Sequence, residues 1–212
     1  MLRYIPFSQL PDFEAALAAA ACRGTLCRRR DALGVALGLC GLRVSEVRGL
    51  RAGNLFAGGS RLFVPTLKGG RDRELSLDPT LTAALLEWRR EAGCAGGPAA
   101  RLLPSKTGGA VHRVRFQAAF NRLADAALGE RYRFHALRHT FAMRCYAATK
   151  DLLLVQRLLG HRSYASTLVY ADALGNIPES CRVRLAPPPV QPGQQLRLFE
   201  PDSADAEEQL VS

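Results

Sequence analysis

The chain has 212 residues, of which 48% are hydrophobic, and it carries a formal net charge of +10 at pH 7. This length and hydrophobic content suffice for one large domain or two small ones with a packed core. Because no apolar run reaches the roughly 18 residues of a membrane span and the N-terminal sequence lacks a signal-peptide layout, we expect a cytoplasmic protein.

The first fifty residues have apolar side chains at helical spacing. They predict three helices, at 8–24, 26–41 and 42–51. Ser8 is the expected N-cap of the first helix, and Gly24 is its expected end.

The pattern changes at 54–77, where apolar and polar residues alternate between the glycine-rich turns "GGS" and "KGGRD". This alternation predicts a small antiparallel sheet of three short strands. A helix follows at 78–93, with Asp78 as its N-cap and Pro79 at its first position.

The second half is again helical until the signal fades beyond Pro178. Helices are expected at about 111–128, 136–148, 151–160 and 163–173. The fold class is therefore mainly α with a small three-stranded antiparallel sheet. Residues 1–185 should form one domain, and the proline-rich, acidic stretch 186–212 should be a largely disordered tail.

The charge distribution indicates the kind of partner, and the cysteine spacing indicates whether a structural metal is expected. Residues 186–212 sum to −4, so the preceding 185 residues carry +14, which makes that part a candidate for binding a polyanion. The six cysteines form no CxxC pair and have no nearby histidine at ligand spacing, so we expect buried thiols and no structural metal.

A set of polar residues stands out against this background. Cleaving a phosphodiester without a metal needs guanidinium groups on the non-bridging oxygens, a nucleophile in line, and a proton for the leaving oxygen. The chain contains residue types that meet these needs: Arg43, Lys68, His135, Arg138, His161 and Tyr170. His135 and Arg138 are three apart on one helix, so they share a face.

The motifs that carry these residues are "GLRVSEVRGL" (41–50), the hairpin "LKGGRDR" (67–73), "HALRHT" (135–140) and "LLGHRSYASTLVY" (158–170). In order, spacing and flanking residues, they resemble the catalytic domain of tyrosine recombinases, the phage integrase family, from about residue 5 to residue 173. The resemblance implies the integrase-like fold and DNA strand cutting and rejoining.

The resemblance also implies the role of each residue. Arg43 and Arg138 would bind the scissile phosphate, and Tyr170 would be the nucleophile that forms a 3′-phosphotyrosine. Lys68 would protonate the leaving 5′ oxygen, while His135 and His161 would orient the phosphate and assist proton transfer. Glu46 would hold the first arginine in place. Such a covalent intermediate needs no cofactor or metal.

Several residues have rivals in the sequence. Lys106 is a second loop lysine that could take the place of Lys68. The other tyrosines, Tyr4, Tyr132, Tyr146 and Tyr164, are interpreted as core or groove residues. The "RRR" run at 28–30 is interpreted as a solvated helix face, with phosphate contact as a second possibility.

The sequence departs from the family at both ends. Most members carry an N-terminal core-binding domain, and from this sequence we expect a catalytic domain without one. In the tail, "QLRLF" (Gln195, Leu196, Leu198 and Phe199 around Arg197) resembles the peptide by which bacterial proteins dock on the sliding clamp. The alternative is that its apolar residues pack on the domain itself or on a neighbouring protomer.

Three functions are compatible with these residues. The first is a site-specific recombinase acting as a tetramer on two paired sites of double-stranded DNA. The second is an enzyme that relaxes or resolves DNA through the same phosphotyrosine without strand exchange. The third is an accessory or excision factor that keeps the fold for DNA binding alone. The complete set of six residues argues against the third.

Overall fold

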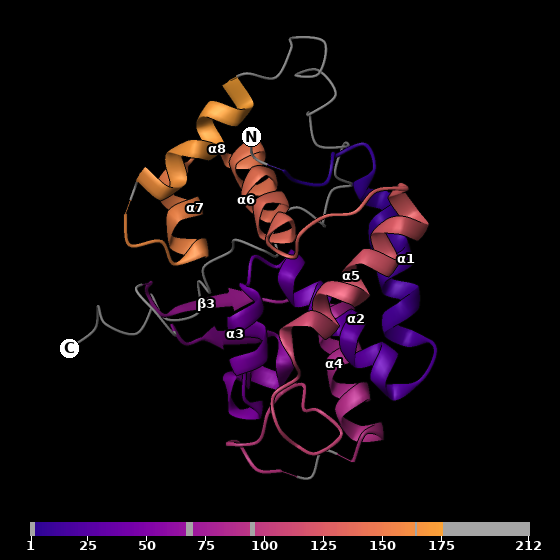
Figure 1. Ribbon diagram of the computed structural model, residues 1–212. Helices are drawn as coiled ribbons and strands as arrows, with labels where there is room; N and C mark the ends of the chain where they lie inside the picture. Colours follow the sequence, from indigo (N-terminus) through magenta and orange to yellow (C-terminus); the bar gives the residue numbers. More distant parts are fainter. Residues whose placement is uncertain (1–2, 67–69, 94–95, 164, 176–212) are drawn as a thin grey trace, which may run out of the picture.

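The protein is described here by a computed structural model that covers residues 3–66, 70–93, 96–163 and 165–175. Figure 1 shows the helices packed against one another, with a small sheet beside α3. The helices are α1 (Leu10–Cys22), α2 (Leu26–Leu39), α3 (Val44–Gly49), α4 (Pro79–Glu91), α5 (Arg113–Leu128), α6 (His135–Thr149), α7 (Leu152–Leu159) and α8 (Ala165–Gly175). The predicted fold class is confirmed.

The sheet lies between α3 and α4 in the chain and has the order β1-β2-β3, with both pairs antiparallel. Its strands are β1 (Leu55–Phe56), β2 (Arg61–Val64) and β3 (Arg73–Ser76). A short 3-10 turn, Ala57–Gly59, joins β1 to β2. Its two glycines have φ of 66° and 90°, a region in which side chains are disfavoured, so glycine suits this turn.

The two predicted N-caps have different outcomes. The Asp78 side chain accepts from the Thr80 N–H at 2.8 Å with Pro79 in the first turn, as predicted. The expected Ser8 cap is wrong, because Gln9 occupies that position without a side-chain cap. A turn in which the Gln9 N–H donates to the Pro6 carbonyl at 3.0 Å delays the start of the helix.

The apolar side chains form two separate cores. The larger core joins α1, α2, α4, α5 and the sheet to one side of α6. The smaller core lies among α6, α7 and α8, which sit together at the top of Figure 1. Its buried members are Ala142, Met143, Cys145, Val155, Leu159 and Tyr170.

The "RRR" run corrects the sequence interpretation. Arg28 is exposed, but Arg29 and Arg30 are 7% and 4% exposed, so they are not a solvated face. α2 packs against α1, α4, α5 and α6 and leaves these side chains little access to solvent. Arg29 pairs with Glu91, and Arg30 pairs with Asp31 at 2.6 Å, which neutralises their buried charge.

The remaining predictions concern the cysteines, the tail and a membrane span. The described cysteines are free thiols; Cys145 is buried, whereas Cys22 is exposed. Lys68, Tyr164, the tail 186–212 and its motif 195–199 lie outside the described residues. Among the described residues, no helix is long and apolar enough to cross a membrane.

Candidate active site

Three arginines converge on one buried carboxylate, Glu46, in the short helix α3. Arg73 on β3 donates to both Glu46 oxygens, at 3.2 and 2.9 Å. Arg43, directly before α3, donates from its backbone N–H at 2.8 Å and from its side chain at 3.0 Å. Arg138 on α6 lies 3.7 Å away from Glu46. The carboxylate therefore fixes the spacing of three cations.

Arg138 also joins the two cores of the molecule. One guanidinium nitrogen, Nη1, donates to the Gly41 carbonyl at 2.8 Å, before α3. The other, Nη2, donates to the Leu159 carbonyl at 2.6 Å, at the end of α7. The side chain is 0% exposed, so its charge lies behind the surface, whereas the Arg43 side chain is 34% exposed.

The charges in this cluster depend on one another. Burial alone would raise the pKa of Glu46, but the hydrogen bonds and charge of Arg73, with Arg43 and Arg138, lower it below 4.5. Burial and the charge of Arg43 lower the pKa of Arg138, while Glu46 opposes them. An arginine nevertheless keeps its proton at neutral pH, so the cluster remains cationic.

Tyr170 on α8 faces this cluster and is 2% exposed. Its hydroxyl lies 3.2 Å from Nδ1 of His139, and its ring stacks against that of His161, with centroids 6.5 Å apart and planes 11° apart. Burial raises the pKa of Tyr170, and the nearby charges of Arg138 and Arg43 oppose that rise. The phenol is thus near enough to both arginines to be influenced by their charge.

His161 is held by the turn between α7 and α8. Gly160 ends α7 with φ of 65°, and the His161 N–H donates to the Gln156 carbonyl at 3.0 Å. Nδ1 of His161 lies 3.0 Å from the hydroxyl of Thr167, a fully buried residue one turn before Tyr170. These contacts fix the orientation of the imidazole.

The histidines of α6 form a pair one turn apart. His135 is exposed, and its ring meets that of His139 edge-on, with centroids 4.5 Å apart. Although part of its side chain reaches solvent, partial desolvation of the ring, together with the charges of Arg138 and Arg43, lowers the pKa of His135. Burial lowers the pKa of His139 to about 4, with smaller contributions from His135 and Arg138. Burial also lowers the pKa of His161 to about 4, with contributions from Arg138 and Arg43. His139 and His161 are therefore neutral at pH 7.

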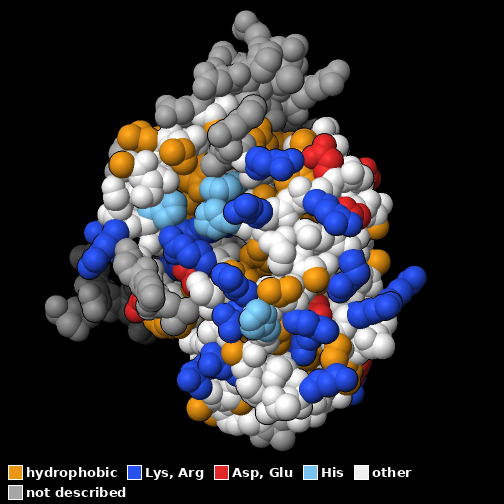
Figure 2. All heavy atoms as spheres, in the orientation of Figure 1, with side chains coloured by type: hydrophobic (Ala, Val, Ile, Leu, Met, Phe, Trp, Pro, Cys, Tyr) orange, Lys and Arg blue, Asp and Glu red, His pale blue; other side chains and the backbone are white. Residues whose placement is uncertain are grey.

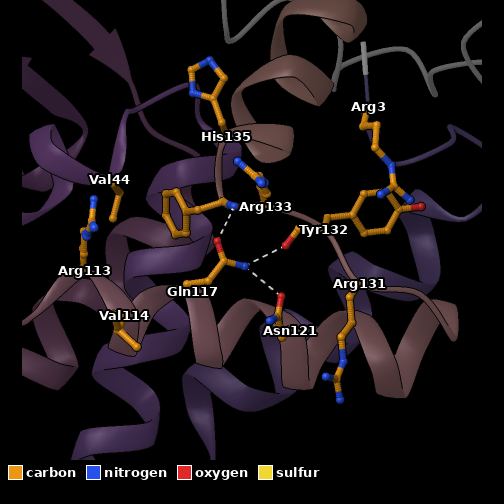
Figure 3. Close-up of a pocket in the computed structure, with 11 residues that line it drawn as sticks. Arg3, Val44, Arg113, Val114, Gln117, Asn121, Arg131, Tyr132, Arg133 and His135 are labelled. Atoms are coloured by element: carbon orange, nitrogen blue, oxygen red, sulfur yellow. Dashed lines mark hydrogen bonds between the residues drawn. The ribbon is translucent and has the colours of Figure 1, made fainter. Parts of the chain in front are cut away.

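A glutamine on α5 sets the start of α6 (Figure 3). The Gln117 side chain accepts from the Phe134 N–H at 2.7 Å and donates to the Tyr132 carbonyl at 2.7 Å. It also donates to Asn121 at 2.8 Å. The loop before α6 is therefore anchored to α5, and His135 begins α6 beside this anchor.

A groove of about 710 Å³ runs from His135 along this loop and α5. Its lining includes four arginines, Arg3, Arg113, Arg131 and Arg133. Figure 2 shows histidines gathered on this face beside Lys and Arg side chains, and more of these basic side chains extend below them. The groove is therefore suited to an anionic ligand that also reaches His135.

The base of the β2–β3 hairpin is tied to the His161 turn. The Arg71 N–H donates to the Gly160 carbonyl at 3.1 Å, and the Thr66 N–H donates to Asp72 at 2.7 Å. Lys68 belongs to the three hairpin residues outside the described range. Its rival Lys106 is exposed in a loop before α5, which lies at the lower end of Figure 1, away from α6–α8.

The structure thus brings together Arg43, Glu46, His135, Arg138, His161 and Tyr170, all of them singled out from the sequence. Among the rival tyrosines, Tyr132 stacks on Phe120, while Tyr4 and Tyr146 pack against the smaller core. Their packing agrees with the interpretation of these three as core or groove residues.

Sequence reasoning missed four residues of the site: Arg73, Gln117, His139 and Thr167. Arg73 shares the buried face of β3 with Leu75, and an arginine on an apolar face signals a buried partner. His139 lies four residues after His135, on the same helix face. No sequence signal distinguishes Gln117 or Thr167 from ordinary helix residues.

The chain matches a known protein family over most of its described length. The model of the phage integrase family matches residues 9–176. The chain belongs to the phage integrase family. The family match thus includes every element of the site described above.

Individual relatives share the sequence or the fold. The putative integrase/recombinase y4rC of Sinorhizobium fredii is 31% identical over 191 residues, which cover 86% of this chain and 57% of that protein. Tyrosine recombinase XerC of Xanthomonas campestris pv. campestris is 34% identical over 131 residues, 61% of this chain and 40% of that protein. The chain thus spans about half the length of the curated relatives it matches.

Among solved structures, the fold is similar to XerH site-specific recombinase bound to palindromic difH substrate in a post-cleavage complex. The TM-score is 0.70 at 22% identity, and the match covers 81% of this chain and 50% of that one. At this identity the similarity concerns the fold.

Proposed function

We propose that the protein is a site-specific DNA recombinase that cuts and rejoins strands through a phosphotyrosine at Tyr170. The single observation that carries this proposal is the position of the buried Tyr170, whose hydroxyl lies 3.2 Å from His139, the residue after Arg138, and whose ring stacks on His161. A phenol, two guanidinium groups and two histidines around one point fit phosphoryl transfer.

Strand cleavage would exchange one phosphate ester bond for another. The phenol of Tyr170 passes its proton to a neutral imidazole of the site as its oxygen forms a bond to the phosphorus. The bond from phosphorus to the 5′ oxygen breaks, which leaves a 3′-phosphotyrosine. Lys68 donates the proton that the 5′ oxygen takes up. Attack by a 5′ hydroxyl reverses these changes and rejoins the strand. The phosphate bond energy is conserved, as in type IB topoisomerase chemistry, so the step needs no nucleotide.

The remaining residues have supporting roles in this proposal. Arg43 and Arg138 stabilise the charge on the non-bridging oxygens, and Glu46 with Arg73 holds both guanidinium groups in place. His135 and His161 donate hydrogen bonds to the phosphate and assist proton transfer. Neutral imidazoles suit this task because each keeps one donor and one acceptor nitrogen.

DNA is the proposed substrate. The arginine-lined groove beside His135 supports this, because guanidinium groups bind phosphates in a planar, paired geometry. The fold neighbour XerH is a recombinase bound to its difH substrate. Binding by phosphate contacts should weaken steeply with salt.

The partners expected from the sequence extend this proposal. Residues 1–185 would be the catalytic unit, assembling as a tetramer on two paired DNA sites at the nucleoid. The tail motif Gln195, Leu196, Leu198 and Phe199 would dock on a bacterial sliding clamp and raise the local concentration of the enzyme on DNA. Deletion of 195–199 should then weaken clamp binding and recombination together; no change in either would remove the clamp from the proposal.

The test of the proposed function is covalent trapping on DNA. Nicked duplexes taken from the DNA beside the gene, and from a random library, are incubated with the full chain and run on a denaturing gel. We expect a protein–DNA adduct that disappears in Tyr170→Phe and persists in the matched control Tyr146→Phe. Recombinant junctions from paired sites then separate recombination from relaxation.

Two results would contradict the proposal. An adduct that survives Tyr170→Phe would move the nucleophile elsewhere. DNA binding without an adduct on any duplex would favour the accessory factor that binds DNA without cutting it.

A further inference from the structure

We infer that His139 is a positioning residue for the nucleophile, accepting a hydrogen bond from the Tyr170 hydroxyl through Nδ1. The inference rests on the proposed function, in which Tyr170 attacks DNA. His139 is a separate residue from the two histidines, His135 and His161, to which that function assigns contact with the phosphate.

The first support is the geometry of the contact. Nδ1 of His139 lies 3.2 Å from the Tyr170 oxygen, and the two rings are tilted by 57° with centroids 5.8 Å apart. Within the described part of the chain this is the one hydrogen bond that the hydroxyl makes. His161 stacks against the same phenol ring. One histidine thus restrains the ring, and the other restrains the oxygen.

The second support is the direction of the hydrogen bond. Tyr170 is 2% exposed, and a buried hydroxyl proton needs an acceptor. If Nδ1 of His139 carried the proton, the imidazole would donate and the phenol proton would have no acceptor among the described residues. The tautomer with its proton on Nε2 satisfies the phenol, so Nδ1 is the acceptor.

The charges around His139 agree with an acceptor. Its nearest ring neighbour is His135, and the charge of Arg138 also faces it. Burial and these two groups hold its pKa near 4, so the ring is neutral at pH 7. The pKa of Tyr170 is raised above 10.0, so the proton stays on the phenol in the free protein. His139 therefore orients the nucleophile and does not deprotonate it in this state.

Orientation is valuable here because attack on phosphorus must occur in line. The other described contacts hold the phenol by its ring, and a ring held by stacking can still rotate its hydroxyl proton freely. A directed hydrogen bond fixes the oxygen lone pairs relative to Arg138, on which the proposed phosphate would lie. The hydrogen bond joins His139 on α6 to Tyr170 on α8, so it also fixes these two helices relative to each other at the site.

Two variants separate positioning from packing. His139→Leu keeps the approximate volume and removes the acceptor, whereas His139→Asn places an amide oxygen near the position of Nδ1. Both are made in the full chain, and urea unfolding shows that each folds. Tyr170→Phe identifies the signals that belong to Tyr170.

The first measurement needs no DNA. Tetranitromethane nitrates the phenolate form of tyrosine, so a buried, hydrogen-bonded phenol reacts slowly, and mass spectrometry reports the rate at Tyr170. Loss of one hydrogen bond should raise this rate about two- to tenfold in His139→Leu, while His139→Asn stays near the wild type. Equal rates in all three proteins would overturn the inferred hydrogen bond.

The second measurement is the rate of adduct formation on nicked DNA at saturating protein. We expect a loss of about tenfold in His139→Leu at unchanged DNA affinity, and recovery to within about threefold in His139→Asn. Equal losses in both variants would mean that the imidazole ring only fills space, and a faster His139→Leu would mean that it restrains attack. If the wild type forms no adduct, the proposed function fails, while nitration still decides the hydrogen bond.

Discussion

The two sides of the candidate site are held in different ways. On the arginine side, Arg43, Arg73 and Arg138 share the carboxylate of Glu46, which lies beside the larger core. On the tyrosine side, Tyr170 belongs to the smaller core, and among the described residues its hydroxyl meets His139 while its ring stacks on His161. Ion pairs in a buried network fix the first side, and packing on three helices holds the second.

The two sides should therefore differ in rigidity. A buried network of charges has one low-energy arrangement, since each displaced group leaves an unpaired charge. A small apolar core tolerates small shifts of a helix at lower cost, and such regions open more readily than the main core. The proposed phosphate-binding groups are therefore rigid, and the proposed nucleophile lies on the more adjustable part.

The largest expected effect comes from breaking the arginine side. Glu46→Gln removes the counter-charge of Arg73 and Arg138, which are 7% and 0% exposed. We expect the free energy of unfolding to fall by about 3–5 kcal/mol, because two buried cations lose their partner. Urea unfolding at pH 7.5 measures this change.

The matched control is Glu74→Gln on β3, where an exposed carboxylate lies 3.8 Å from Arg61. Its loss should cost less than about 1 kcal/mol. Similar losses in the two variants would show that Glu46 is no more important than a surface carboxylate.

A smaller effect is expected at the glycine that ends α7. Gly160 and Gly129 both have left-handed backbones, with φ of 65° and 66°. A methyl group at Gly160 would lie 2.7 Å from the Arg71 carbonyl, whereas one at Gly129 would have nothing within 4 Å. Gly129→Ala should cost about 1 kcal/mol for backbone strain. Gly160→Ala should cost about 2–4 kcal/mol, because the clash adds to the strain.

Urea unfolding of both variants measures the difference, and the His161 turn should be the affected region. Equal costs would show that the hairpin yields to the added methyl group, and that the contact between Gly160 and Arg71 is loose.

The smallest expected effect is that of mild acid on the tyrosine side. His139 and His161 have a pKa of about 4 in the folded protein, below the ordinary 6.5. Below pH 6.5 the unfolded chain therefore binds protons that the folded protein does not. The stability that these groups contribute is present above pH 6.5 and is lost as the pH falls toward 4.

The measurement is urea unfolding at pH 7.5 and pH 6, where Glu46 remains ionised. The double variant His139→Asn, His161→Asn should lose less stability over this step than the wild type. An unchanged loss would assign the acid sensitivity to other groups.

The sequence predicted the helices, the three strands and six members of the site because those features leave local marks. Asp78 and Pro79 mark the start of a helix. The motif "HALRHT" marks the start of α6, and "LLGH" marks the end of α7. Contacts between distant segments leave no such mark. The pairing of Arg73 with Glu46 joins residues 27 apart, and that of His139 with Tyr170 joins residues 31 apart.

The buried arginines of α2 show the same limit in the other direction. "RRR" has the composition of a surface, yet Arg29 and Arg30 are enclosed because four helices surround α2. Their burial depends on Glu91 and on Asp31, which neutralise them. Local composition therefore does not indicate exposure where helices pack around a basic run and carboxylates, on the same helix or on a neighbour, pair with it.

The closed base of the β2–β3 hairpin has a consequence for how this site can vary. The Thr66–Asp72 and Arg71–Gly160 hydrogen bonds clamp the hairpin below its tip and attach it to the turn that carries His161. Thr66 and Arg71 are therefore held in place on either side of residues 67–69. Insertions or deletions between these two residues should leave the imidazole of His161 where it is.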